Sequence, residues 1–132
     1  MDIEILKIAS DTKNHKVLKD CTHKSLQKNS ICGDQMEVSI KVAKGQILDF
    51  GYQCKSCIFC QASASVLSNF SLNNKISNID KAISFFNTFF QNKVTKIPKE
   101  FKKFELLFQE KNLSRKDCIL LPFKALNKAL KS

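Results

Sequence analysis

Half of the six cysteines of this chain stand in one short run, as Cys54, Cys57 and Cys60. Thiolates are nucleophiles and soft metal ligands, so this spacing could serve a metal centre or sulfur chemistry. The segment before the run alternates like a strand, with Leu48, Phe50, Tyr52 and Cys54 expected on one face, and the residues after the run repeat like a helix. Unpaired N–H groups at the start of a helix favour negative charge and therefore stabilise a thiolate. The run is the first candidate for a functional site.

Three uses of these cysteines compete. A ferredoxin-type cluster has the same two-residue gaps but needs a fourth cysteine after three further residues, where Ala64 stands. A structural zinc knuckle needs two cysteine pairs, whereas Cys32 and Cys118 are single. The third use is a labile metal and sulfur site built from Cys32, Asp34, Cys57 and Cys118. A carboxylate in place of one thiolate suits a site that must exchange ligands.

A strand hairpin is the element expected to assemble such a site. Alternating apolar residues predict one strand over residues 36–42 and a second over residues 46–53. In an antiparallel pair the start of the first strand lies opposite the end of the second. We therefore expect Cys32 and Asp34 to approach Cys54 and Cys57.

The rest of the chain predicts helices around a small sheet. An edge strand is expected over residues 22–27, and helices are expected over residues 3–12 and 58–70, from Ser77 as the N-cap, from Pro98, and from about Ile119 onward. Pro122 is expected in the first turn of the last helix, where its missing N–H would be unpaired anyway. Phenylalanines recur at helical spacing in the later helices and predict core positions. The expected fold is α+β, a small antiparallel sheet packed against several helices, in one domain over residues 1–132.

Composition limits the cellular setting and the partners. No apolar run long enough for a secretory signal or a membrane span is present, so we expect a cytoplasmic protein with reduced thiols and no membrane contact. The net charge of +10 comes from lysines spread along the chain, with Arg115 as the single arginine. Phosphate and base recognition usually uses arginine forks, so we expect a solvated lysine surface, with an acidic protein partner as the alternative, and no nucleic-acid binding.

Three ordered motifs resemble a known family over essentially the whole chain. They are Cys32-Gly33-Asp34, Cys57 five residues before Ala62-Ser63-Ala64-Ser65, and Cys118-Ile119-Leu120-Leu121-Pro122 before a terminal helix. This order is similar to the U-type iron–sulfur cluster assembly family, which comprises IscU, SufU and the NifU N-terminal domain. The long gap between Cys57 and Cys118 resembles the SufU branch, and the Leu-Pro-Pro-Val-Lys motif of the IscU branch is missing.

The resemblance implies an IscU/SufU-like fold and a role as scaffold or sulfur acceptor rather than as a classical enzyme. It implies that Cys32, Asp34, Cys57 and Cys118 hold zinc or iron, with a transient [2Fe-2S] cluster as cargo. A cysteine desulfurase would deliver persulfide sulfur to Cys118 or Cys57. Acceptor apoproteins or downstream Suf/Isc components would be further partners.

Several residues leave alternatives open at the site. Asp117 stands where the IscU branch has a histidine ligand, so the fourth ligand could be Asp34 or Asp117. Cys60 lies one helical turn after Cys57 on the same face, so it could substitute as a ligand or relay sulfur, and Cys54 is a further thiol that could substitute as a ligand. The cations beside Cys118 in the sequence are expected to lower the pKa of its thiol.

The alternative function belongs to another class. A small structural zinc-binding interaction module would hold its ion with Cys54, Cys57, Cys60 and one remote cysteine, without sulfur transfer. Cys32-Gly33-Asp34 would be superfluous in such a module, so this motif discriminates between the two functions.

Overall fold

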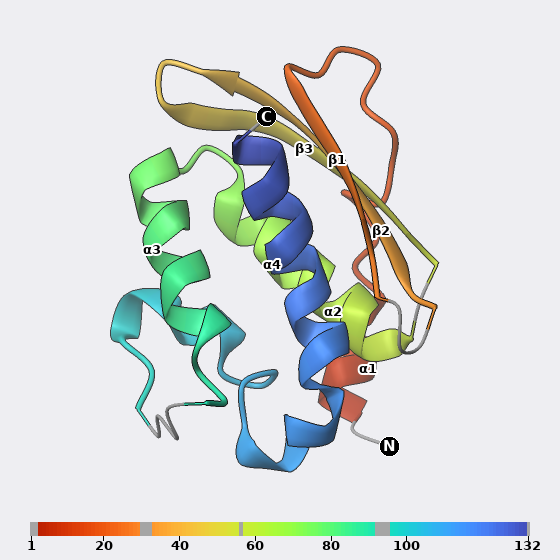
Figure 1. Ribbon diagram of the computed structural model, residues 1–132, viewed down its shortest axis with the longest axis vertical. Coiled ribbons are helices and arrows are strands. Elements are labelled where there is room, and N and C mark those ends of the chain that lie inside the picture. Colours follow the sequence, from red (N-terminus) through yellow and green to blue (C-terminus); the bar gives the residue numbers. More distant parts are fainter. Residues whose placement is uncertain (1–2, 30–32, 56, 92–95, 132) are drawn as a thin grey trace.

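The computed structural model describes residues 3–29, 33–55, 57–91 and 96–131. In chain order the elements are α1 (Ile3–Ala9), β1 (His23–Lys28), β2 (Gln35–Ala43), β3 (Gln46–Lys55), α2 (Ile58–Ser71), α3 (Ile76–Asn87), the 3-10 helices η1 (Lys99–Phe104) and η2 (Glu110–Arg115), and α4 (Lys116–Leu130). The sheet stands along one side of the molecule, and the helices pack beside it (Figure 1). The predicted α+β class, with a small antiparallel sheet and several helices, is confirmed.

The sheet has three antiparallel strands in the order β1-β2-β3. Gln35 at the start of β2 pairs with Lys55 at the end of β3, so the hairpin places the residues before β2 beside those after β3. Helix α4 packs on β1 and β2, and α2 packs on β3 and on α4. The hairpin and the strand-to-helix junction after it are therefore arranged as predicted.

A β-bulge changes which residues of β3 face the core. The pairing shifts between Lys41 and Val42, so that Asp49 pairs with Lys41 but Ile47 pairs with Val42. One extra residue in a strand reverses the alternation beyond it. Leu48, predicted to share a face with Phe50, is 45% exposed, whereas Ile47 is 0% exposed. The prediction for Leu48 was wrong because regular alternation cannot anticipate the bulge.

The helices between α2 and α4 differ in detail from the predictions. Helix α3 begins at Ile76 and has no side-chain cap, so the cap predicted at Ser77 is absent. The segment after Pro98 forms 3-10 turns rather than one α-helix, and Phe101 at φ −108° and ψ 17° interrupts the first of them. The phenylalanine spacing identified buried positions correctly but not the type of helix.

Helix α4 begins three residues earlier than predicted, at Lys116 rather than near Ile119. Pro122 therefore lies inside the helix. A proline has no N–H, so it cannot donate the helical hydrogen bond to the carbonyl four residues earlier, which is that of Cys118. The expectation that Pro122 occupies the unpaired first turn was wrong, and the missing bond falls on the Cys118 carbonyl.

The predicted phenylalanine core is confirmed. The ring of Phe86 lies 4.1 Å from that of Phe108 and 4.9 Å from that of Phe104, centroid to centroid. Phe123 of α4 joins this cluster at 5.5 Å from Phe104. Aromatic pairs at such distances add to the energy of burial itself. The cluster fastens α3, η1 and the segment after η1 to α4.

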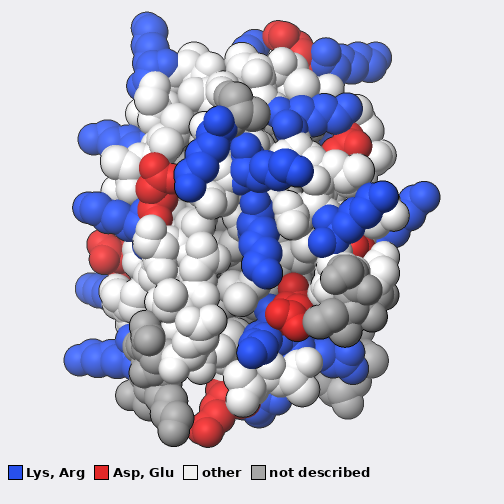
Figure 2. All heavy atoms as spheres, in the orientation of Figure 1, with Lys and Arg blue, Asp and Glu red and all other residues white. Residues whose placement is uncertain are grey.

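The surface is rich in lysine. Figure 2 shows lysine and arginine side chains spread over the visible face, with acidic side chains among them. This distribution agrees with the expected solvated lysine surface. Within the described ranges, no helix combines the length and the apolar character needed to cross a membrane.

Candidate metal centre

Two thiols and a carboxylate converge at one end of the molecule. One side-chain oxygen of Asp34 and the Sγ atoms of Cys57 and Cys118 all lie within 4.8 Å of one another. Asp34 directly precedes β2, Cys57 is the N-cap of α2, and Cys118 lies in the first turn of α4. The starts of these three elements meet at the lower end of the view in Figure 1. Residues more than eighty positions apart in the sequence thus form one cluster, which we call the triad.

The local backbone places Asp34 and Cys57. Gly33 has φ +73°, a left-handed conformation that residues other than glycine rarely adopt. Its neighbour Asp34 accepts a backbone hydrogen bond of 2.8 Å from the Asn29 N–H, which ties the start of β2 to the end of β1. The Cys57 carbonyl accepts hydrogen bonds from the N–H groups of Cys60 and Gln61 as α2 begins. The glycine between two candidate ligands is therefore explained by the turn.

Two contacts hold the first turn of α4 against α2. The Ser63 hydroxyl donates a buried hydrogen bond of 2.6 Å to the carbonyl oxygen of Ile119, next to Cys118. The Arg115 guanidinium lies over the ring of Phe59, 5.6 Å from its centroid. The small residues of α2 permit this approach to α4. The position of Cys118 thus depends on α2.

Burial raises the pKa of the Cys118 thiol well above its ordinary value. Hydrogen bonds with Cys57 and Asp34, and negative charge on both, raise this pKa further. The sequence had predicted a lowered pKa from Arg115 and Lys116, and that prediction was wrong. Both of those side chains are exposed, and Arg115 is directed to Phe59. Without a bound cation the thiol form of Cys118 is favoured.

The other candidate ligands lie outside the triad. Asp117 is half-buried in the first turn of α4 but does not join the cluster. Adjacent helical residues point about 100° apart, so Asp117 and Cys118 cannot share a direction. Cys32 lies outside the described residues, and its predicted role stays a prediction.

Cys54 and Cys60 lie together rather than in the triad. Their Sγ atoms are 3.6 Å apart. Cys60 was expected on the face of Cys57, but Cys57 is the N-cap of α2 and has extended backbone (φ −71°, ψ 168°), so the helical spacing does not align the two thiols. The sequence analysis missed this pairing, although the end of a strand followed closely by a helix was a signal that it could have used.

The donor set fits a thiolate-binding metal ion. Zinc takes sulfur ligands at about 2.3 Å and carboxylate oxygens at roughly 2.0–2.2 Å, in a tetrahedron. Donor atoms within 4.8 Å of one another can reach such an ion after small side-chain movements. Two sulfurs and one oxygen leave one tetrahedral position for a further ligand. Iron accepts the same donor types.

The family of the chain follows from comparison with known proteins. The model of the NifU-like N terminal domain matches residues 2–131. The chain belongs to this family. The resemblance to the U-type iron–sulfur cluster assembly scaffolds is thereby confirmed.

Individual relatives agree with this assignment. The NifU-like chain is 29% identical over 127 residues to the iron–sulfur cluster assembly scaffold protein IscU of Thermotoga maritima, covering 96% of this chain and 89% of the relative. A crystal structure of the N-terminal part of a nitrogen-fixing NifU-like protein from Brucella abortus has a TM-score of 0.88 at 20% identity, over 98% of this chain and 91% of that one.

A third similar protein has the same fold. The crystal structure of a putative iron–sulfur cluster assembly scaffold protein for the SUF system, from Fervidobacterium islandicum AW-1, has a TM-score of 0.87 at 18% identity. The match covers 98% of this chain and 96% of that chain. At this identity the likeness is one of fold.

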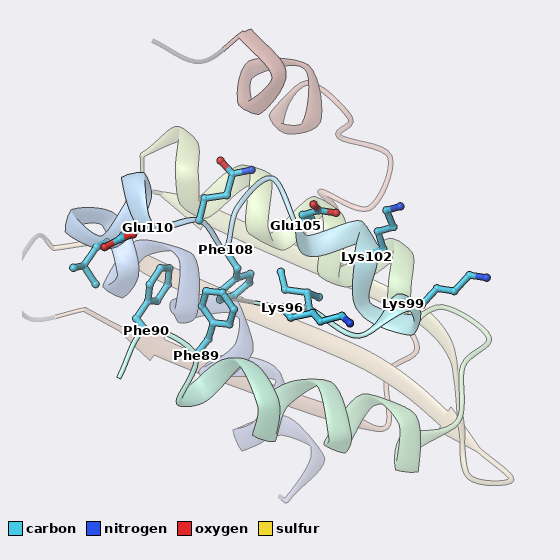
Figure 3. A pocket seen from close by; sticks show the side chains of 11 residues that line it. Phe89, Phe90, Lys96, Lys99, Lys102, Glu105, Phe108 and Glu110 are labelled. Atoms are coloured by element: carbon cyan, nitrogen blue, oxygen red, sulfur yellow. The ribbon is translucent and has the colours of Figure 1, made fainter. Parts of the chain in front are cut away.

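A separate pocket lies between the end of α3 and the two 3-10 helices. Figure 3 shows Phe89, Phe90 and Phe108 grouped along one side of it, while Lys99 and Lys102 extend outward. Within the described part of the chain, its lining contains no cysteine and no residue of the triad. The pocket is therefore distinct from the candidate metal centre.

Proposed function

We propose that this NifU-like chain is an iron–sulfur cluster assembly scaffold that accepts persulfide sulfur from a cysteine desulfurase. The metal ligands would be Asp34, Cys57 and Cys118, with Cys32 as the fourth. The convergence of two thiols and a carboxylate at the triad is the observation that carries this proposal. Iron and sulfide would be cargo that passes to acceptor apoproteins or downstream Suf/Isc components in the cytoplasm.

The protonation state of Cys118 decides whether its sulfur can react. In the triad its thiol is hydrogen-bonded to Asp34 and Cys57, and its raised pKa keeps the proton in place. A bound zinc or iron ion would supply the positive charge that favours the thiolates at neutral pH. The labile carboxylate ligand suits a site in which one thiolate must be released for reaction.

Sulfur transfer is then a displacement at sulfur. The Cys118 thiolate attacks the outer sulfur of the desulfurase persulfide and forms a new S–S bond. The S–S bond of the desulfurase breaks, and its cysteine leaves as a thiolate that takes up a proton. The outer sulfur ends as a persulfide on Cys118, and no external oxidant or reductant is required.

The structural zinc module has less support. That alternative needs Cys54, Cys57 and Cys60 to bind one ion, but Cys54 and Cys60 face each other while Cys57 faces Cys118. Asp34, which the module does not need, lies at the triad. The arrangement of the sulfurs therefore favours the scaffold.

The test combines metal analysis with sulfur transfer. Protein purified without oxygen is analysed for zinc, iron and acid-labile sulfide and is then incubated with a desulfurase and cysteine. We expect persulfide on the wild-type chain, its loss in Cys118→Ser, and strong reduction in Cys57→Ser. Cys21→Ser is the matched control, because Cys21 is half-buried and lies outside the triad. Full transfer to both triad variants would refute the proposal.

A further inference from the structure

Cys54 and Cys60 form a second thiol site beside the triad. Cys54 is the penultimate residue of β3, and Cys60 lies in the first turn of α2. Their Sγ atoms are 3.6 Å apart, and neither residue belongs to the triad. The proposed sulfur transfer leaves both thiols unused. Their chemistry therefore has to be considered separately.

The two thiols are held in facing positions by well-packed backbone. Cys54 pairs with Met36 across the antiparallel β2–β3 hairpin, and Met36 is fully buried. Helix α2, which carries Cys60, is packed on β3 and α4. A disulfide bond is about 2.05 Å long, so the sulfurs need to approach by roughly 1.5 Å, which side-chain rotation can supply. Fixed neighbours of this kind react with each other far faster than with separate molecules.

The two thiols differ in access to solvent. Cys60 is 0% exposed, whereas Cys54 is half-buried. An external reagent can therefore reach Cys54 but not Cys60. Once Cys54 has reacted, the nearest available thiol is Cys60, and its burial excludes a second reagent molecule. This difference in exposure means that Cys54 reacts first and Cys60 second.

We infer that Cys54 and Cys60 are a redox-active dithiol, which low-molecular-weight disulfides oxidise to an intramolecular disulfide. The Cys54 thiolate attacks one sulfur of the reagent, a mixed disulfide forms, and the first reagent thiolate leaves. Cys60 then attacks the Cys54 sulfur and expels the second reagent thiolate. Two protein thiols are oxidised to one disulfide, and the reagent is reduced to two thiols that carry away both protons.

The location of the pair gives this oxidation a consequence for the triad. The disulfide would join the end of β3 to the first turn of α2, on either side of Cys57. Cys57 would then lie within a short covalent loop. Oxidation of Cys54 and Cys60 would thus fix covalently the strand-to-helix junction that carries Cys57.

The test uses the full metal-free chain and oxidised glutathione as the reagent. After reaction, the remaining thiols are alkylated, the chain is cleaved with trypsin, and the peptides are mapped by mass spectrometry. Cleavage after Lys55 places Cys54 and Cys60 on separate peptides, so a disulfide between them links the two. We expect the linked pair, with no glutathione on Cys54, in the wild-type chain and in Cys57→Ser. The second variant excludes a link from Cys54 to Cys57.

Single substitutions test the order of reaction. Cys60→Ser should trap glutathione on Cys54, and Cys54→Ser should leave Cys60 unmodified. Cys21→Ser is the control and should form the same linked pair as the wild-type chain. Stable glutathione on Cys54 of the wild-type chain, or loss of the link in Cys57→Ser, would overturn the inference. The wild-type map decides the question even if Cys60→Ser fails to fold, and it does not depend on sulfur transfer at the triad.

Discussion

The hydroxyl of Ser63 on α2 donates a 2.6 Å hydrogen bond to the carbonyl oxygen of Ile119, the residue after Cys118. Both residues are fully buried, so no water can replace the hydroxyl if it is removed. The bond connects the helix that begins at Cys57 with the helix that carries Cys118. The two helices that position the triad thiols are therefore held together by this hydrogen bond.

Removing the Ser63 hydroxyl should weaken both the fold and metal binding. We expect Ser63→Ala to lower the free energy of unfolding by about 1–2 kcal/mol, because a buried carbonyl loses a partner. Zinc affinity should fall as well, since the first turn of α4 loses a restraint. Ser65→Ala is the matched control, because its buried hydroxyl donates to the Asp11 carbonyl, away from the triad. Urea unfolding and zinc titration measure the two effects, and equal zinc affinity in both variants would contradict this view.

Zinc should stabilise the native chain by linkage. A ligand that binds only the folded state adds about 2.7 kcal/mol at a hundredfold excess over Kd, so a chelator should lower the melting temperature. Asp34→Asn should weaken this effect, because a neutral amide is a poorer ligand than a carboxylate. Asp49→Asn is the control, since Asp49 is paired with Lys16 on the surface. Identical melting curves with zinc and with chelator, at verified metal content, would exclude the site.

In the metal-free chain, Cys118 should react slowly with alkylating reagents. Its raised pKa keeps the thiol protonated at neutral pH, and only the thiolate is a strong nucleophile. We expect slower labelling than at Cys21 and a rate that rises with pH beyond the ordinary thiol range. Asp34→Asn should accelerate the reaction by removing a negative charge that raises this pKa. Faster labelling of Cys118 than of Cys21 at pH 7 would contradict this prediction, because it would show that Cys118 is already largely a thiolate.

The hairpin and the strand-to-helix junction were predictable because they depend on local pattern. The alternation after Met36 and the small residues after Cys57 fix both elements, and their register alone brings Asp34 to Cys57. The bulge beside Leu48 depends on packing against other elements, so alternation could not reveal it. The pKa of Cys118 was mispredicted for a related reason: the prediction considered only the sequence neighbours Arg115 and Lys116, whereas burial raises this pKa most, followed by Cys57 and Asp34, which are distant in sequence.

Tyr52 should make the stability of the fold depend on alkaline pH. Burial, followed by the charges of Cys54, Asp11 and Cys60, raises the pKa of Tyr52 to about 12 from 10.0. Above pH 10 the unfolded chain releases this proton while the folded chain retains it, so stability should fall between pH 10 and 12. The slope contributed by one such group is at most about 1.4 kcal/mol per pH unit. Urea unfolding of Tyr52→Phe should lack this contribution, and an unchanged pH dependence would show that Tyr52 does not supply it.

Pro122 leaves the first turn of α4 with fewer backbone hydrogen bonds to the rest of the helix than an uninterrupted helix would have. Because the proline cannot bond to the Cys118 carbonyl, the turn that carries the thiol is joined to the remainder of the helix by one backbone bond fewer than usual. Opening that turn costs correspondingly less free energy, while Phe123 keeps the later turns anchored in the aromatic cluster. The first turn of α4 is thus bonded less completely to the rest of its own helix and depends more on its contacts with α2, and the thiol to which we assign sulfur transfer lies in that turn.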